Sequence, residues 1–522
     1  MFYIKTFVIL QPQLQLMKKY CTVILLFAFL SLLNSSTAQP TFITDSLNNY
    51  IKQGMKDWQI PGLSIVIVKD GQVVHINGYG IKNITTKEPV DIQTLFMIAS
   101  NTKLFTGTAL AQLEYRNKLS LNDKITNYFP AYELYDSNTT KLVTIKDLLS
   151  HRIGTKTFQG DFTFFDSKLT RKEIMFKMRY LKPSRNFRQD FGYCNSCFLT
   201  AGEVIPIVSG KPWEVYIYDS LITPLQMTNT HVLGKGIEKI PNAATPYTTS
   251  FTGKLNAVPY DAWDNMAPAA SMISNVQDLS HWLIMQLDSG KYKQNQIVAW
   301  PIIQKTRDVN ITYNSRKSLL YPMHFQGYGL GIFVGDYNGK QIYWHTGGAS
   351  GMVSNVCFVP EEKLGIAILT NNDNQNFFEA LRYQILDAYL NVPYINRSKQ
   401  QLNYFNEPEA QSLQEIATLQ SRIKNNLPPL NINAYTGIYH HTLYGKIEIT
   451  AIKNQLHVTF KSHHNLTATL DYLDNNEWLL QYNNILYGIF STKFLIKNNK
   501  VQSISIKAND FIEYDAYTFE KE

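Results

Sequence analysis

Charged residues are scarce in this 522-residue sequence, since Asp, Glu, Lys and Arg together make up only 17 % of it. An average soluble chain has about 25 %. Aromatic residues reach 13 % and apolar residues 44 %, which excludes a disordered protein, because disordered chains have few aromatic residues. The net charge of +8 contains no block of five or six Lys or Arg. The sequence therefore predicts a folded protein of about two to four domains without a nucleic-acid partner.

Cysteine is also scarce, with four in the whole chain, and a protein of this length does not need a disulfide framework. Cys194 and Cys197 form a CxxC pair, but no second CxxC or HxxxH accompanies them. The sequence therefore predicts no metal site and no cofactor, and the pair is expected near a helix start, as thiols or as a disulfide. The histidine pairs His440–His441 and His463–His464 are expected to be solvated surface residues.

Acidic residues are absent from positions 1–38, which have the order of features of a secretory signal peptide. Lys18 and Lys19 precede an apolar run over Val23–Leu33, and small residues follow up to Ala38. The run is shorter than the roughly 18 to 20 residues that span a bilayer. We expect cleavage after Ala38 and export to the periplasm or the medium, with no membrane span left after processing. An uncleaved anchor is the alternative.

The rest of the chain has two contrasting parts. In residues 39–395, strand-like runs at both ends, such as Gly62–Gly80 and Gly365–Thr370, enclose mainly helical segments, which predicts an α/β body with a sheet built from both ends. Residues 396–430 form a polar linker with one short amphipathic helix. Residues 431–522 show seven strand-like runs and no helix, which predicts a small antiparallel barrel or sandwich.

Ser100 and Lys103 are three positions apart at the start of a predicted helix. This spacing places the hydroxyl and the amine on one helical face, one turn apart. A desolvated lysine with a lowered pKa can take the serine proton, and the helix N-terminus favours negative charge there. The same spacing recurs at Ser421 and Lys424 in the linker, so a serine and a lysine three positions apart do not by themselves identify a site.

Two further motifs follow in the chain. Tyr193 and Asn195 are two positions apart, so the phenol and the amide face one side of an extended segment or turn. His345, Thr346 and Gly347 lead a glycine-rich turn into a strand-like run. The order S-x-x-K, Y-x-N, H-T-G resembles the serine β-lactamase and penicillin-binding-protein superfamily, in its class C, D-peptidase and esterase-like branch.

Three other segments support this resemblance, which covers residues 42–393. Leu148–Gly154 is similar to the family's LLxHxSG, Pro224–Thr230 to its PLGMxxT, and Ser274–Trp282 to its STxxDLxxW. The C-terminal part resembles the lipocalin-like domain appended to some of these hydrolases. The resemblance implies an α/β (α+β) fold, with an antiparallel sheet flanked by helices, a helical subdomain and a C-terminal all-β barrel.

The resemblance also implies a role for each catalytic residue. Ser100 would be the acylated nucleophile and Lys103 its activating partner. Tyr193 would carry the proton to the leaving group, as a phenol or as a phenolate stabilised by Lys103. The backbone N–H groups of Ser100 and Gly348 would form the oxyanion hole, in which each donor contributes roughly 3 to 4 kcal/mol in related acyl-transfer chemistry.

Substrate binding would involve Asn195, through its amide, together with His345, Thr346, Gly347 and Gly348. A histidine in place of the superfamily's better-known lysine is mostly neutral at pH 7, which weakens the capture of a substrate carboxylate. We therefore expect an exported serine hydrolase acting on short D-residue peptides or amides, or on small esters. The alternatives are a β-lactamase proper and a catalytically silent protein that binds peptidoglycan-like peptides or a partner.

Overall fold

The computed structural model describes residues 39–424 and 426–522, and the expected signal peptide lies outside them. The chain divides into two compact units, one ending at Tyr50 and one over Ile51–Glu522. The first described elements are η1 (Phe42–Ser46) and α2 (Leu47–Asp57). Within the described residues, no helix combines the length and the apolar character that crossing a membrane requires.

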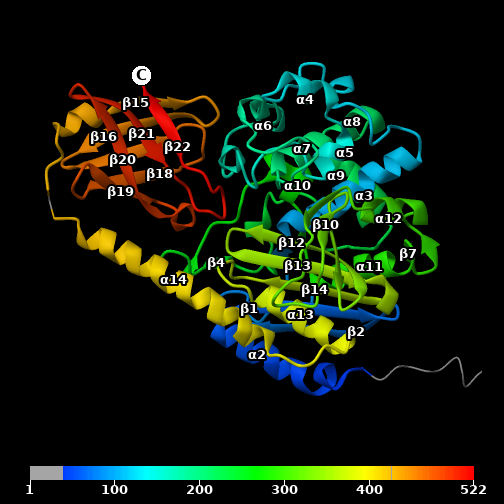
Figure 1. The fold of residues 1–522 in the computed structure, drawn as a ribbon. Coiled ribbons are helices and arrows are strands. Elements are labelled where there is room, and N and C mark those ends of the chain that lie inside the picture. The colour runs from blue at the N-terminus through cyan, green and yellow to red at the C-terminus, as the bar shows by residue number, and fades with distance from the viewer. Residues whose placement is uncertain (1–38, 425) are drawn as a thin grey trace, which may run out of the picture. The chain divides into compact units, whose positions relative to one another are not determined.

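Eight antiparallel strands form the main sheet, in the order β2-β1-β14-β13-β12-β11-β10-β9 (Figure 1). The strands are β1 (Gly62–Lys69), β2 (Gln72–Gly80), β9 (Ile311–Asn314), β10 (Gln326–Tyr328), β11 (Phe333–Tyr337), β12 (Lys340–Ala349), β13 (Met352–Val359) and β14 (Leu364–Thr370). Val66 of β1 pairs with Ala367 of β14, so the prediction of a sheet built from both ends is confirmed. The β1–β2 turn has positive φ at Asp70 and Gly71, as a two-residue hairpin requires.

Both faces of the sheet are covered, because every residue of β13 and β14 is buried. The helices α11 (Val276–Leu287) and α13 (Phe377–Tyr389) pack against these strands. Continuous apolar runs such as that of β14 are typical of strands buried on both faces. The central position of β12, β13 and β14 gives the segment around His345 a rigid support.

The apolar, strand-like run Tyr328–Gly335 is interrupted between β10 and β11. Gly331 has φ +84°, and a Cβ there would lie 2.4 Å from the carbonyl oxygen of Lys103. A side chain would therefore push away α3 (Thr102–Tyr115), whose first turn carries that lysine. The interruption lets this helix approach the sheet.

The helical subdomain surrounds α3, whose residues 102–113 are all buried. Its other helices are α4 (Ser137–Leu142), α5 (Ile145–Leu149), α6 (Arg171–Lys177), α7 (Asn195–Gly202), α8 (Val204–Ser209), α9 (Trp213–Ile217), α10 (Ala267–Ala270) and α12 (Trp300–Arg307). Short two-stranded pairs join the connections: β3 (Phe96–Met97) with β6 (Ile273–Ser274), β4 (Tyr247–Thr248) with β5 (Asn256–Ala257), and β7 (Lys291–Tyr292) with β8 (Asn295–Gln296). The helices α7, α9, α10 and α12 all pack on α3, which fixes the helix that begins at the S-x-x-K motif.

The linker contains a longer helix than predicted, because α14 runs from Arg397 to Ser421 with Asn396 as its N-cap. The C-terminal part is a closed barrel of eight strands in chain order, the arrangement of up-and-down barrels such as lipocalins. The strands are β15 (Gly437–His441), β16 (Gly445–Ile452), β17 (Gln455–Phe460), β18 (Thr467–Tyr472), β19 (Glu477–Tyr482), β20 (Ile489–Lys497), β21 (Lys500–Ile506) and β22 (Tyr517–Lys521). The sequence prediction missed β15.

One histidine of the C-terminal part is not a surface residue. His463 is only 3 % exposed, its ring stacks on Phe162 with centroids 4.4 Å apart, and its Nε2 donates a hydrogen bond to the Phe162 carbonyl at 2.9 Å. The expectation that this histidine is solvated was therefore wrong. Burial lowers its pKa to about 4, so the ring is neutral at pH 7 and is held by packing.

Candidate active site

Ser100 and Lys103 meet at the start of α3, as their spacing predicts. Ser100 lies in a 3-10 turn, η2 (Ala99–Asn101), that runs directly into the helix. The Lys103 Nζ donates a hydrogen bond to the Ser100 Oγ at 3.0 Å. Ala99 has φ +47°, a left-handed conformation that non-glycine residues adopt at a cost, and such strain is concentrated at functional sites. Ser100, the predicted nucleophile, therefore lies on a sharply turned backbone.

The Lys103 amine is fully buried and has two further acceptors. It donates to the Asn195 Oδ1 at 2.7 Å and to the Ala269 carbonyl at 2.9 Å. Burial lowers its pKa from 10.5 to about 7, while the nearby Asp161 carboxyl opposes this shift. Removing an ammonium group from water disfavours its charged form. A neutral amine is therefore available near pH 7, hydrogen-bonded to the serine whose proton it would take.

Tyr193 lies just before α7, and its ring packs against the ring of His151. The two rings are 4.2 Å apart, and the His151 Nδ1 accepts a hydrogen bond from the backbone N–H of Cys194 at 3.0 Å. Burial lowers the pKa of His151 well below its ordinary value, so the ring is neutral. This contact agrees with a structural role for His151 and positions the phenol.

The tyrosine is a neutral phenol in this environment. Burial raises the pKa of Tyr193, although a hydrogen bond with the Ser100 side chain opposes the shift. Because Lys103 has a pKa of about 7, it loses its proton before Tyr193 does. The suggestion of a phenolate stabilised by the lysine is therefore not supported, and a proton relay through a neutral phenol fits the site.

Asn195 is oriented from both sides of its amide. Its Oδ1 accepts from Lys103, and its Nδ2 donates to the Asp161 Oδ2 at 2.6 Å. The other Asp161 oxygen has no protein hydrogen-bond partner, and burial raises the pKa of this carboxyl well above its ordinary range. The sequence prediction missed Asp161, because no motif surrounds it.

His345 lies on β12 and is buried, with 1 % exposure. Its Nδ1 donates to the Thr346 carbonyl oxygen at 2.6 Å, and its Nε2 accepts from the Tyr328 hydroxyl at 2.8 Å. The Nδ1 atom therefore carries a proton, because a carbonyl oxygen only accepts, and in the neutral ring Nε2 is the acceptor. Burial lowers the pKa of His345 to about 3. The ring therefore supplies no positive charge at pH 7.

The residues after His345 separate into two groups. Thr346 and Gly348 line a cavity together with Ser100. Gly347 lies on the other side of the strand, where a Cβ would be 2.0 Å from the Ile98 carbonyl oxygen. The absence of a side chain at Gly347 allows β12 to approach the segment that leads into Ser100, and its predicted part in substrate binding stays a prediction.

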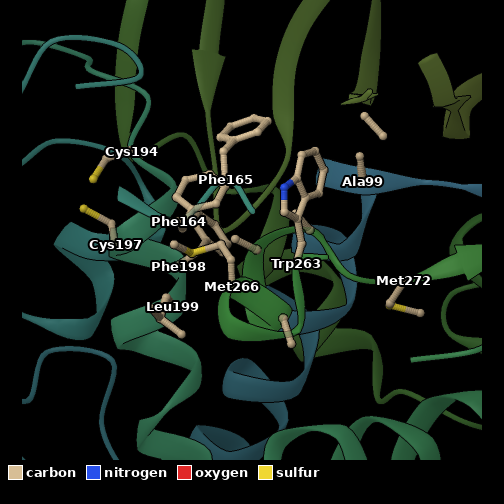
Figure 2. Packing of buried hydrophobic residues seen from close by; sticks show 14 of the residues in the cluster. Ala99, Phe164, Phe165, Cys194, Cys197, Phe198, Leu199, Trp263, Met266 and Met272 are labelled. Atoms are coloured by element: carbon tan, nitrogen blue, oxygen red, sulfur yellow. The ribbon is translucent and has the colours of Figure 1, made fainter. Parts of the chain in front are cut away.

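The cavity beside Ser100 has a volume of about 260 Å³. Its lining residues are Ser100, Thr157, Phe158, Asp161, Phe164, Phe165, Phe191, Tyr193, Asn195, Trp263, Ala270, Phe333, His345, Thr346, Gly348 and Phe511. Seven of these sixteen are Phe or Trp, and none is Lys or Arg. Figure 2 shows three of the aromatic side chains, Phe164, Phe165 and Trp263, close together. The structure therefore surrounds the motif residues with a wall that is rich in aromatic side chains and contains no Lys or Arg.

The CxxC pair follows Tyr193 in the chain: Cys194 directly precedes α7 and Cys197 belongs to that helix, and both are labelled in Figure 2. Both are buried free thiols, and a hydrogen bond joins them. Within the described residues, no group of three or more His, Cys, Asp or Glu is arranged to hold a metal ion. The pair therefore contributes to the packing next to Tyr193.

Comparison with solved structures supports the fold. The octameric penicillin-binding protein homologue from Pyrococcus abyssi superposes with a TM-score of 0.57 at 22 % identity, over 92 % of this chain and 100 % of that chain. At this identity the likeness concerns the fold alone.

Curated proteins align at low identity over most of this chain. Protein flp of Staphylococcus aureus (strain COL) is 27 % identical over 372 residues, which cover 68 % of this chain and 70 % of that protein. The unguisins hydrolase ungD' of Aspergillus campestris is 27 % identical over 424 residues, or 76 % of each chain.

Two family models match the two parts of the chain. The domain of unknown function DUF3471 matches residues 421–521, which contain the barrel. The Beta-lactamase model matches residues 47–390, which contain the S-x-x-K, Y-x-N and H-T-G motifs. Members of this family are generally serine hydrolases, and the match extends over more than half of the sequence. The chain therefore belongs to the Beta-lactamase family.

Proposed function

We propose that this protein is an exported serine hydrolase that forms an acyl-enzyme on Ser100. The observation that carries the proposal is the buried Lys103 amine, which lies 3.0 Å from the Ser100 Oγ and has a pKa of about 7. A general base works best when its pKa is near the working pH. Export rests on the signal-peptide features of residues 1–38.

The reaction follows from the positions of these groups. The neutral Lys103 amine takes the Ser100 proton while the Oγ attacks the substrate carbonyl carbon, and a tetrahedral oxyanion forms. The backbone N–H groups of Ser100 and Gly348 would stabilise that oxyanion. The Tyr193 hydroxyl then gives a proton to the leaving amine or alcohol and is reprotonated from the lysine. Water repeats the sequence on the acyl-enzyme and releases the acid.

The preferred substrates would be uncharged where they meet the H-T-G strand. The neutral His345 and a cavity wall without Lys or Arg offer no cation for a carboxylate. We therefore favour short D-residue amides without a free carboxylate there, or small esters, over β-lactams and C-terminal carboxylates. The relative named as an unguisins hydrolase supports a hydrolytic reaction over a silent binding role.

Covalent labelling tests this proposal. The purified protein is exposed to a fluorophosphonate and, separately, to a penicillin, and its intact mass is measured. We expect one fluorophosphonate adduct on the wild type, none on Ser100→Ala, and strongly slowed labelling of Lys103→Ala. The matched control is Ser421→Ala, from the second S-x-x-K tetrad, which should label like the wild type. Absence of label with both reagents would exclude the acyl-enzyme and favour a silent binding protein.

A further inference from the structure

The C-terminal part of the chain contributes a side chain to the cavity at Ser100. Phe511 lies in the segment 507–516, between β21 and β22, and lines the cavity. Its ring rests on Gly348, because a Cβ at that glycine would lie 2.8 Å from the Phe511 Cε2. The ring is therefore beside the backbone that would supply one of the two oxyanion donors.

This segment is anchored by a buried carboxylate two residues further on. Glu513 is 1 % exposed and accepts hydrogen bonds from the backbone N–H of Gly160 at 2.5 Å and of Phe162 at 3.2 Å. The Tyr444 hydroxyl lies 2.8 Å from both of its oxygens, and the Tyr517 hydroxyl also donates to it. Four donors from both parts of the chain thus fix one carboxylate, which restricts the position of the neighbouring phenylalanine.

The two residues that follow Glu513 make further contacts that strengthen the anchor. The Tyr514 ring stacks on Phe158 with centroids 5.6 Å apart, and Phe158 itself lines the cavity. Asp515 accepts hydrogen bonds from the Lys156 amine at 3.0 Å on each oxygen. Consecutive residues of the C-terminal part therefore hold the loop 156–162, which also carries Asp161, the hydrogen-bond partner of Asn195.

The cavity that Phe511 lines is rich in aromatic side chains. Trp263 makes an edge contact with Phe165 at 5.1 Å, and Phe165 stacks on Phe164 at 4.9 Å (Figure 2). The cavity has a volume of about 260 Å³. An apolar substrate group that binds in it removes aromatic surface from water, which stabilises the complex. A carboxylate would lose its hydration there without gaining an ionic partner, because no Lys or Arg lines the cavity.

We propose that Phe511 is a specificity-determining residue, through which the C-terminal barrel completes an apolar subsite for an uncharged aromatic or branched aliphatic group of the substrate. This inference rests on the proposed function, because it concerns the same acyl-transfer site. The barrel is then part of the active site, and its contribution is selective: it affects substrates with a large apolar acyl group more than substrates with a small one.

A series of p-nitrophenyl esters with acetyl, butyryl and phenylacetyl groups tests the subsite in the full chain. In Phe511→Ala we expect the ratio of kcat/KM for phenylacetyl to acetyl esters to fall about tenfold. Phe511→Leu should retain most of the ratio, because it keeps an apolar side chain. Glu513→Gln should lower the ratio, since an amide cannot accept all four hydrogen bonds.

The matched control is Phe490→Ala, which removes a half-buried phenylalanine of the same barrel that does not line the cavity, and its ratio should not change. An equal loss for all esters in Phe511→Ala, or an increased ratio, overturns the subsite. A wild-type protein that hydrolyses none of the esters overturns the proposed function instead. A wild type that hydrolyses them, with a ratio that Phe511→Ala leaves unchanged, overturns only the inference about the barrel.

Discussion

The chain contains the S-x-x-K spacing twice, and the two copies differ in their surroundings. Lys103 is fully buried and donates to Ser100, to Asn195 and to a backbone carbonyl. Ser421 and Lys424 lie exposed at and just beyond the end of α14. The Ser421 Oγ is occupied with the Thr418 carbonyl, to which it donates at 2.8 Å.

The comparison separates proximity from reactivity. A spacing of three residues brings a hydroxyl and an amine onto one helical face in any helix. Only desolvation lowers the lysine pKa to about 7. Asn195 orients the amine through a hydrogen bond, and in the proposed mechanism Tyr193 gives the proton a path. The motif therefore becomes chemically significant through residues about 90 positions away in the sequence.

The two S-x-x-K copies should differ most in how much the replacement of their lysine lowers activity. Lys103→Ala should lower kcat/KM for an ester by about 10²- to 10⁴-fold, because the general base is lost. Lys424→Ala should leave kcat/KM unchanged. Steady-state assays of both variants measure the comparison directly. Equal effects of the two substitutions would contradict the assignment of the base.

The pH dependence of fluorophosphonate labelling should also distinguish Lys103 from Lys424, by a smaller factor than the loss of kcat/KM in Lys103→Ala. Lys103 must be neutral to accept the serine proton, so the fluorophosphonate rate should rise about tenfold per pH unit below pH 7 and level off above it. His345 has a pKa of about 3 and stays neutral over this range. Lys424→Ala should show the wild-type profile. A rate that is constant from pH 5 to pH 9 would show that another group activates Ser100.

Local patterns were sufficient for much of this molecule. The Asp70-Gly71 turn between two β-branched runs predicts the β1–β2 hairpin, and polar–apolar alternation predicts seven of the eight barrel strands. The missed strand, β15, is a five-residue segment with two histidines. It contains too few apolar residues for a polar–apolar alternation to be recognised. Its place in the barrel is set by pairing with β16 and β22, which no local signal contains.

The surroundings of the motifs could not be predicted in the same way. Asp161 and Phe511 lack motif neighbours, and they reach the cavity only because chain segments about 350 residues apart are held together at Glu513. The break before Phe333 depends on the close approach of α3 to Gly331. Such contacts arise from tertiary packing, whereas sequence patterns report mainly local geometry and burial.

The smallest expected difference concerns stability. In the folded protein Lys103 has a pKa of about 7 against an ordinary value of 10.5. Between these values the unfolded chain holds a proton that the folded chain has released, so the free energy of unfolding rises with pH over this window. Below pH 7 the protein bears the full cost of burying the ammonium group.

Lys103→Met removes the cost of burying the ammonium group and also removes three hydrogen bonds. The loss of these bonds lowers the free energy of unfolding by a similar amount at each pH. The Tm of the variant relative to the wild type should therefore be higher at pH 6 than at pH 10, by at least about 2–4 °C, the shift that roughly 1 kcal/mol gives in a domain of 150–250 residues. Lys424→Met should show no such pH dependence, because that side chain is exposed. Thermal melts of both variants at the two pH values measure the difference. A relative Tm of Lys103→Met that is independent of pH would mean that burial does not lower the pKa of Lys103, and would remove the physical distinction between the two S-x-x-K copies.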